Sequence, residues 1–274
     1  MLLPLNFHKT FIPERRLIAA LLEYASQGKA GNHAEIAAET GIPMGKSSGK
    51  VPAILDYSRG MGLVELEGPA GKFPKQLRLT DFGRVVYEHD RWLGQPLTQW
   101  LAHLHLCLPD TGATVWYKVF VEGRHVIGSS FRVEQLEDYL VAIFGPGRKR
   151  RGPLVQAYLD DAAMGRALVL RQDGDLIRRE KAPLRDEFAF AYAAFFLKVL
   201  EDRFADEFQV TTSDFNDRTR CFDSCLWETS EIEQALTLME RTGNIGIDRQ
   251  MRPWIVERRA SAGEAWDRIY QADG

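Results

Sequence analysis

The first quarter of the chain alternates between helical and strand-like patterns of apolar residues. In residues 13–25 one face carries the apolar side chains Leu17, Ile18, Leu21, Leu22 and Ala25. Apolar residues at such intervals predict an amphipathic helix. Residues 33–40 predict a second, shorter helix that Gly41 ends. A third helix is predicted from Val51 to Ser58, with Pro52 in its first turn, where proline is tolerated.

After Gly60 and Gly62 the apolar positions alternate with polar ones instead. Residues 63–66 and 77–79 flank the loop GPAGKFPK, so they predict two strands of a hairpin. Thr80 then begins a further helix, TDFGRVVYEHD, as its N-cap. The resulting order of helix, helix, turn, helix and hairpin is typical of a winged helix-turn-helix domain.

The rest of the chain is predicted to be mainly helical. Residues 96–121 read as packed helices rich in aromatic residues, and residues 132–144 as another amphipathic helix. The basic turn GPGRKRRGP and the segment LVQAYLDD follow, which predicts a second, degenerate helix-turn-helix. In the last third, helices are predicted at 188–200 and 230–241, followed by a strand-like ending near 245–256. No internal repeat of convincing period is evident.

These patterns predict an α+β fold, mainly α with small β wings. We expect a winged helix-turn-helix domain at residues 1–92. A helical domain with the second helix-turn-helix should follow at 93–182, and a C-terminal helical subdomain at 183–274.

Composition and charge narrow the classes of protein to which the chain can belong. The 274 residues are 45% apolar and carry a net charge of −3, so any contact with nucleic acid must come from a local basic patch. Three cysteines form no disulfide framework, which fits a reduced, cytoplasmic setting. We expect neither a signal peptide nor a membrane-spanning segment.

Two basic stretches are the candidate DNA contacts. The stretch GKSSGK lacks the spacing of a phosphate-binding loop. It instead precedes the predicted third helix, where hydroxyl and basic groups can contact phosphates or base edges. The predicted wing and the turn of the second helix-turn-helix add further cations. The candidate DNA-binding residues are Lys46, Ser47, Ser48, Lys50, Lys72, Lys75, Arg148, Lys149, Arg150 and Arg151. A solvated helix cap or a protein-docking surface is the alternative interpretation of these residues.

The residue types that carry catalysis do not form a recognised motif. Cys221 and Cys225 lie four positions apart without the further ligands that zinc requires, so they are expected to be buried thiols. His103 and His105 point in different directions on a helix, so they are not expected to form a metal-binding pair. The acidic pairs Asp160/Asp161 and Asp214/Asp217 are expected to be helix caps or solvated surface rather than ligands of a nuclease metal. We therefore expect no enzyme, no cofactor and no metal site.

Several sequence blocks taken together resemble the bacterial family called domain of unknown function 4007. The blocks are HKTFIPE, TGIPMGKSSGKVPAILDYSRGMGLVE, LTDFGRVVYEHD, WLAHLHL, TVWYKVF and TSEIEQALTLMERTGNIGIDRQ. The resemblance implies an accessory factor that occurs with sulfur-transfer enzymes of the phosphoadenosine phosphosulfate reductase type, and with DNA phosphorothioation or antiphage defence systems. It supplies no catalytic residues.

Three functional hypotheses follow. The first is a non-catalytic subunit that binds double-stranded DNA in a prokaryotic DNA-modification or defence system. The second is an adaptor that holds a reductase-like or ATPase partner from a defence or sulfur-transfer operon. The third is a nuclease built on Asp214 and Asp217. The sequence leaves open the oligomeric state and the sequence specificity of any DNA binding.

Overall fold

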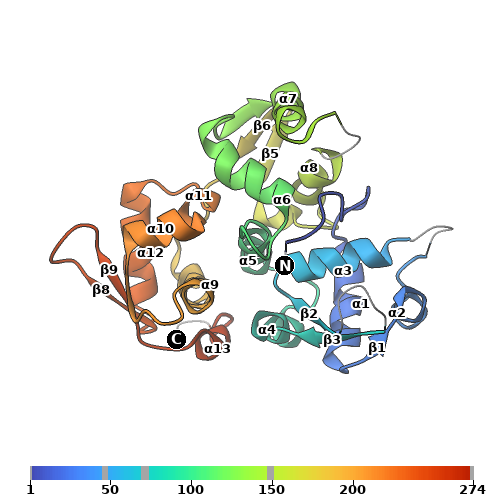
Figure 1. Cartoon of the computed structure of the whole chain (residues 1–274), viewed down its shortest axis with the longest axis horizontal. Helices are drawn as coiled ribbons and strands as arrows, with labels where there is room; N and C mark the ends of the chain where they lie inside the picture. Colours follow the sequence, from blue (N-terminus) through green and yellow to red (C-terminus); the bar gives the residue numbers. More distant parts are fainter. Residues whose placement is uncertain (1, 45–48, 69–73, 147–150, 272–274) are drawn as a thin grey trace. The chain divides into compact units, whose positions relative to one another are not determined.

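A computed structural model describes residues 2–44, 49–68, 74–146 and 151–271, without the side chain of Arg151. The chain forms two compact units, Met1–Glu180 and Lys181–Gly274. Both predicted domains before residue 183 fall almost entirely in the first unit. Helices and small antiparallel sheets make up both units, which confirms the predicted α+β fold (Figure 1). Within the described residues no helix is long and apolar enough to cross a membrane.

The first unit begins with the helices and the hairpin that the sequence predicts. They are α1 (Arg15–Ser26), β1 (Ala30–Gly31), α2 (His33–Thr40), α3 (Val51–Gly60), β2 (Val64–Glu67), β3 (Lys75–Leu79) and α4 (Asp81–His89). The short strand β1 was not predicted, and it completes an antiparallel sheet of order β1-β3-β2. Helix α1 packs against α2, α3, α4 and β3. The assignment of this region as a winged helix stays a prediction.

Local capping and close packing explain why these elements begin where they do. Asn32 Oδ1 accepts hydrogen bonds from the N–H groups of Ala34 and Glu35, and the Glu35 carboxylate accepts one from the Asn32 N–H. This reciprocal cap fixes the start of α2. At α4, a Cβ on Gly83 would lie 1.8 Å from the Leu63 carbonyl oxygen. Glycine is therefore required for α4 to approach the start of β2.

The remainder of the first unit combines helices with a second sheet. Its elements are α5 (Pro96–Leu106), α6 (Thr114–Trp116), the π-helix η1 (Tyr117–Val121), the 3-10 helix η2 (Glu122–His125), β4 (Ser130–Arg132), α7 (Val133–Phe144), α8 (Arg151–Leu159), the 3-10 helix η3 (Gly165–Ala167), β5 (Leu170–Asp173) and β6 (Leu176–Arg179). The strands form a sheet of order β4-β6-β5. A helical domain was expected here; its strands were not predicted, and the hairpin β5–β6 pairs with β4.

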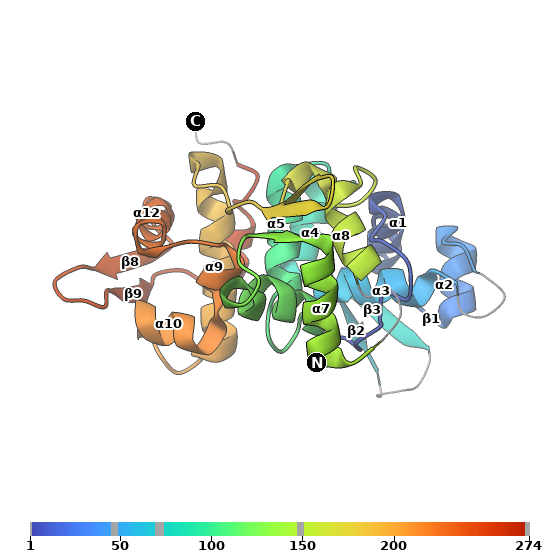
Figure 2. The ribbon, with the colours of Figure 1, turned by 90° about the horizontal axis from the view of Figure 1, so that it is seen from above.

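The second unit also contains a sheet. Its elements are the 3-10 helix η4 (Asp186–Phe188), α9 (Ala189–Arg203), β7 (Gln209–Thr211), α10 (Thr212–Thr219), α11 (Cys221–Ser224), α12 (Thr229–Glu240), β8 (Ile245–Asp248), β9 (Ile255–Arg258) and α13 (Ala262–Trp266). The apolar helix α9 packs against α10, α12 and α13. The hairpin β8–β9 extends away from α9 in both views (Figures 1 and 2). The subdomain predicted as helical therefore also holds a three-stranded sheet, of order β7-β9-β8.

In the part of the chain that the structure describes, one arrangement occurs three times. A strand, two main helices and a hairpin follow each other, and the first strand pairs with the last strand of the hairpin. We call these arrangements the first motif (β1 to β3), the second motif (β4 to β6) and the third motif (β7 to β9). The expectation of no internal repeat was therefore wrong for the topology. The motifs begin at Ala30, Ser130 and Gln209, so the intervals between them are unequal.

Candidate functional site

Three of the predicted DNA-binding residues lie within the described residues. Lys50 immediately precedes α3, forms an ion pair with Glu14 and lies 5.5 Å from the centre of the Phe11 ring. Its side chain is only 26% exposed. Lys75 begins β3, where its Nζ donates a 2.9 Å hydrogen bond to the Gly68 carbonyl. Arg151 is the first residue of α8.

The other predicted contacts lie outside the described residues: Lys46, Ser47, Ser48, Lys72, Arg148, Lys149 and Arg150. These residues immediately precede α3, α8 and β3 in the sequence. The described residues therefore do not test whether the predicted basic residues lie close together. The structure does show that the Lys50 charge is partly compensated by Glu14.

Asp214 and Asp161, one residue from each acidic pair, make local contacts. Asp214 Oδ2 accepts a hydrogen bond from Thr211 Oγ1, which in turn accepts one from the Asp214 N–H, so this residue takes part in the cap of α10. Asp161 pairs with Arg15 and with Arg166. The hydrogen bond from Arg166 lowers the pKa of Asp161. Among the described residues, no group of three or more His, Cys, Asp and Glu side chains is arranged to hold a metal ion.

The cysteines and His103 belong to the interior. Cys221 and Cys225 are both buried, and burial raises the pKa of Cys221 to about 12. A thiol with such a pKa is a poor nucleophile near neutral pH. His103 Nδ1 lies 2.6 Å from the Tyr158 hydroxyl oxygen, which also accepts a hydrogen bond from Trp116 Nε1. These three buried side chains form a polar contact inside the first unit.

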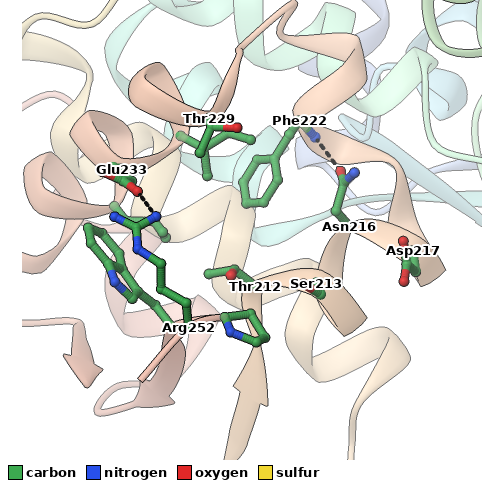
Figure 3. A pocket seen from close by; sticks show the side chains of 12 residues that line it. Thr212, Ser213, Asn216, Asp217, Phe222, Thr229, Glu233 and Arg252 are labelled. Carbon is green, nitrogen blue, oxygen red and sulfur yellow. Dashed lines mark hydrogen bonds and ion pairs between the residues drawn. The ribbon is translucent and has the colours of Figure 1, made fainter. Parts of the chain in front are cut away.

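A cavity of about 360 Å³ lies in the third motif (Figure 3). Two helix faces form most of its lining, and the tip of the β8–β9 hairpin completes it. The face of α10 contributes Thr212, Ser213, Asn216 and Asp217; α12 contributes Thr229, Ile232, Glu233 and Leu236; the hairpin contributes Arg252, Pro253 and Trp254; and Phe222 of α11 completes the set. We call this space the third-motif cavity.

Helical spacing explains why these side chains meet. Ser213, Asn216 and Asp217 follow the i, i+3, i+4 pattern, as do Thr229, Ile232 and Glu233, so each set occupies one helix face. Of the residues that line this cavity, only Asp217 was a candidate site residue from the sequence. The polar spacing on residues 213–217 was visible, but a pairing with residues 252–254 could not be read from a local pattern.

Hydrogen bonds and ion pairs hold the walls of the cavity. Asn216 Oδ1 accepts a hydrogen bond from the Phe222 N–H at 3.3 Å. Glu233 of α12 forms an ion pair with Arg252 of the hairpin at one side of the cavity (Figure 3). The Phe222 ring is buried and points into the space between these residues. The cavity thus combines an aromatic floor with a polar rim.

Two arginines of the hairpin lie close to the Trp254 ring. The guanidinium carbons of Arg249 and Arg252 lie 5.1 and 5.4 Å from its centre. Arg249 also forms a 2.7 Å ion pair with Glu240 of α12. This ion pair and that of Glu233 with Arg252 therefore connect the hairpin to α12.

No protein-family model matches the chain, and no curated protein matches it. Two solved structures are similar in fold. The magnesium ion-bound crystal structure of SspB has a TM-score of 0.68 at 16% identity, and a second SspB crystal structure has a TM-score of 0.67 at 15% identity. Each comparison covers 98% of this chain and 90% of the SspB chain. The chain therefore shares its fold with SspB along almost its whole length.

Proposed function

We propose that the chain is a non-catalytic, DNA-binding accessory subunit of a prokaryotic DNA-modification or antiphage defence system. The observation that carries this proposal is the threefold arrangement of strand, two helices and hairpin. In helix-turn-helix proteins such helices and wings lie in the grooves and along the backbone of DNA.

The biological system in which we place the chain is inferred from its resemblance to a known family. The sequence blocks that resemble the domain of unknown function 4007 family imply a phosphorothioation or defence context. The fold shared with SspB, at 15–16% identity, supports the architecture alone. The family resemblance therefore supports a role in such a system, with partners from the same operon.

The charge distribution indicates that the motifs contribute unequally. Basic residues lie before or at the start of the second main helix of the first and second motifs, at Lys46, Lys50 and Arg148 to Arg151. In the third motif, α12 instead carries Glu231, Glu233 and Glu240, which pair with Lys181, Arg252 and Arg249. Because carboxylates repel phosphates, we assign the backbone contacts to the first two motifs.

Salt-dependent binding to duplex DNA tests the proposal. The logarithm of the binding constant should fall linearly with the logarithm of salt concentration, with a slope of about −0.9 per phosphate neutralised. Fluorescence anisotropy with a labelled duplex between about 50 and 200 mM salt measures this slope. Binding that is absent at low salt would overturn the DNA-binding role.

The non-catalytic part of the proposal has a separate test. Incubation of supercoiled plasmid with the protein and magnesium should leave the plasmid uncut. Nicking that disappears in an Asp217→Asn variant would overturn the non-catalytic assignment and support the nuclease hypothesis. An Asp214→Asn variant serves as comparison, because Asp214 takes part in the cap of α10.

One observation favours an adaptor as the second candidate function. The Lys50 side chain, predicted to face DNA, is paired with Glu14 and partly buried. An adaptor that holds a reductase-like or ATPase partner does not need this charge to be available. Co-purification with neighbouring gene products, together with the absence of DNA binding, would favour the adaptor.

A further inference from the structure

The third motif differs from the other two in the space between its helices. In the first motif α2 packs against α3, and in the second α7 packs against α8. In the third motif the short helix α11 is inserted between α10 and α12 in the chain. The two main helices line opposite sides of the third-motif cavity (Figure 3).

The floor of this cavity suits a flat apolar group. The Phe222 ring, Ile232 and Leu236 come from the helices, and Trp254 comes from the hairpin. Nucleobases bind to proteins by stacking on aromatic rings and on guanidinium planes. Arg252, whose guanidinium lies over Trp254, provides such a plane at the cavity wall.

The rim supplies hydrogen-bonding groups of both kinds. Ser213 and Thr229 carry hydroxyls, Asn216 an amide and Asp217 a carboxylate. Hydroxyls and amides donate and accept, whereas a carboxylate only accepts. The edges of bases present a similar mixture of donors and acceptors.

The charge of the lining disfavours a phosphate as occupant. Asp217 and Glu233 carry two negative charges against the single positive charge of Arg252. The volume of about 360 Å³ lies at the lower end of the range for small-ligand sites. A neutral aromatic heterocycle with polar edges matches both the charge and the size.

We propose that the third-motif cavity binds a single unpaired nucleobase. The inference deepens the proposed DNA-binding function and rests on it where the base comes from DNA; a free nucleoside is the other source of the same chemistry. Extruding a paired base from a duplex is costly, whereas an unpaired base is released more readily. The cavity therefore gives the protein a preference for DNA with an unpaired base.

Two duplexes that differ only in one central unpaired adenine test this preference. The protein should bind the duplex with the unpaired base about tenfold or more tightly, because the cost of unpairing is avoided. Thr229→Trp should fill the cavity and abolish the preference while leaving affinity for the fully paired duplex unchanged. Ser213→Phe fills the cavity from the opposite helix and should act in the same way. Ser230→Trp is the matched control, because Ser230 is exposed on the same helix and does not line the cavity.

In a second experiment, each of the four deoxynucleosides is titrated into the protein and its binding is measured by calorimetry. If the wild-type protein binds the two duplexes equally tightly and binds no nucleoside, the base site is overturned and the DNA-binding function stands. Nucleoside binding that Thr229→Trp removes, without binding to either duplex, supports the base site and overturns the DNA-binding function. A preference for the unpaired base that survives in both Thr229→Trp and Ser213→Phe also overturns the cavity as its origin.

Discussion

Glu233 of α12 and Arg252 of the β8–β9 hairpin form an ion pair at one side of the third-motif cavity. The side chain of Glu233 is 30% exposed and that of Arg252 is 67% exposed, so the pair is accessible to water. An exposed pair of this kind contributes less than about 1 kcal/mol to stability. Its main effect is to position Arg252 beside the cavity.

Glu233→Gln should therefore loosen the hairpin tip without unfolding the second unit. Amide hydrogen exchange of residues 249–254 should become faster, while exchange in α9 stays unchanged. The melting temperature should fall by no more than the small effect of an exposed pair. Unchanged exchange at the tip would show that the pair does not hold the hairpin.

Gly83→Ala should destabilise the first unit. The added Cβ would lie 1.8 Å from the Leu63 carbonyl oxygen, so α4 must move away from β2. Overpacking of this kind typically costs about 1–3 kcal/mol, which chemical denaturation measures. Gly152→Ala is the matched control, because a Cβ there meets no atom within 4 Å. This helical position should tolerate alanine or gain slight stability.

Stability in acid should depend in part on Glu240. The hydrogen bond from Arg249 holds the pKa of this carboxyl below its ordinary value of 4.5. A carboxyl whose pKa is lowered by folding stabilises the fold above its ordinary pKa, and this contribution disappears as the pH falls through the folded-state pKa. Glu240→Gln should therefore reduce stability at pH 7 and lose less stability than the wild type on acidification. Parallel pH–denaturation profiles of the two proteins would contradict this expectation.

Removal of Glu14 should reveal whether Lys50 contacts DNA. Glu14→Gln breaks the ion pair and leaves the lysine charge available. If Lys50 neutralises a phosphate, the Glu14→Gln variant should bind duplex DNA more tightly than the wild type. The double variant that carries Lys46→Glu and Lys50→Glu should bind more weakly, and its binding constant should depend less steeply on salt concentration. Equal affinities in all three proteins would place the DNA-binding surface elsewhere.

Replacement of Arg148, Lys149, Arg150 and Arg151 by alanine should weaken DNA binding equally for every sequence. Cations that bind phosphates read no base information, and the salt slope should become shallower by about 0.9 for each phosphate that is no longer neutralised. Ser47→Ala and Ser48→Ala should instead change sequence preference, because they precede the helix expected to face base edges. A folded quadruple variant with wild-type affinity would exclude the turn from the DNA-binding surface.

Local patterns predicted the helices and the hairpin of residues 15–89 well. The apolar spacing from Val51 begins a helix that the structure extends from Val51 to Gly60, and the Thr80 cap was also correctly placed. The two-residue strand β1 was missed because its pairing with β3 determines it, and that partner is distant in the sequence. The hairpin β5–β6 was missed although Gly174 provides a turn with a φ of +60°. The alternation of apolar and polar residues along this hairpin is obscured by charged residues, including the buried Arg179.

The third-motif cavity lay beyond prediction for a different reason. Its walls come from Thr212 through Trp254, and each segment alone looks like an ordinary amphipathic helix or hairpin. Only the insertion of α11 and the folding back of the hairpin bring them together. A cavity of this kind depends on tertiary packing, which no local periodicity encodes.

The pairing of the first strand with the last strand requires a similar loss of chain entropy in each of the three motifs. Ala30 pairs with Gln76, Ser130 with Arg178 and Gln209 with Glu257, so the paired residues lie 46, 48 and 48 positions apart. The entropic cost of closing a chain segment grows only with the logarithm of its length. Closure is therefore almost equally unfavourable in all three motifs, despite their unequal spacing along the chain. Differences in the order in which they form must arise from their side-chain packing, and the aromatic helix α9 gives the third motif a large apolar surface on which to condense.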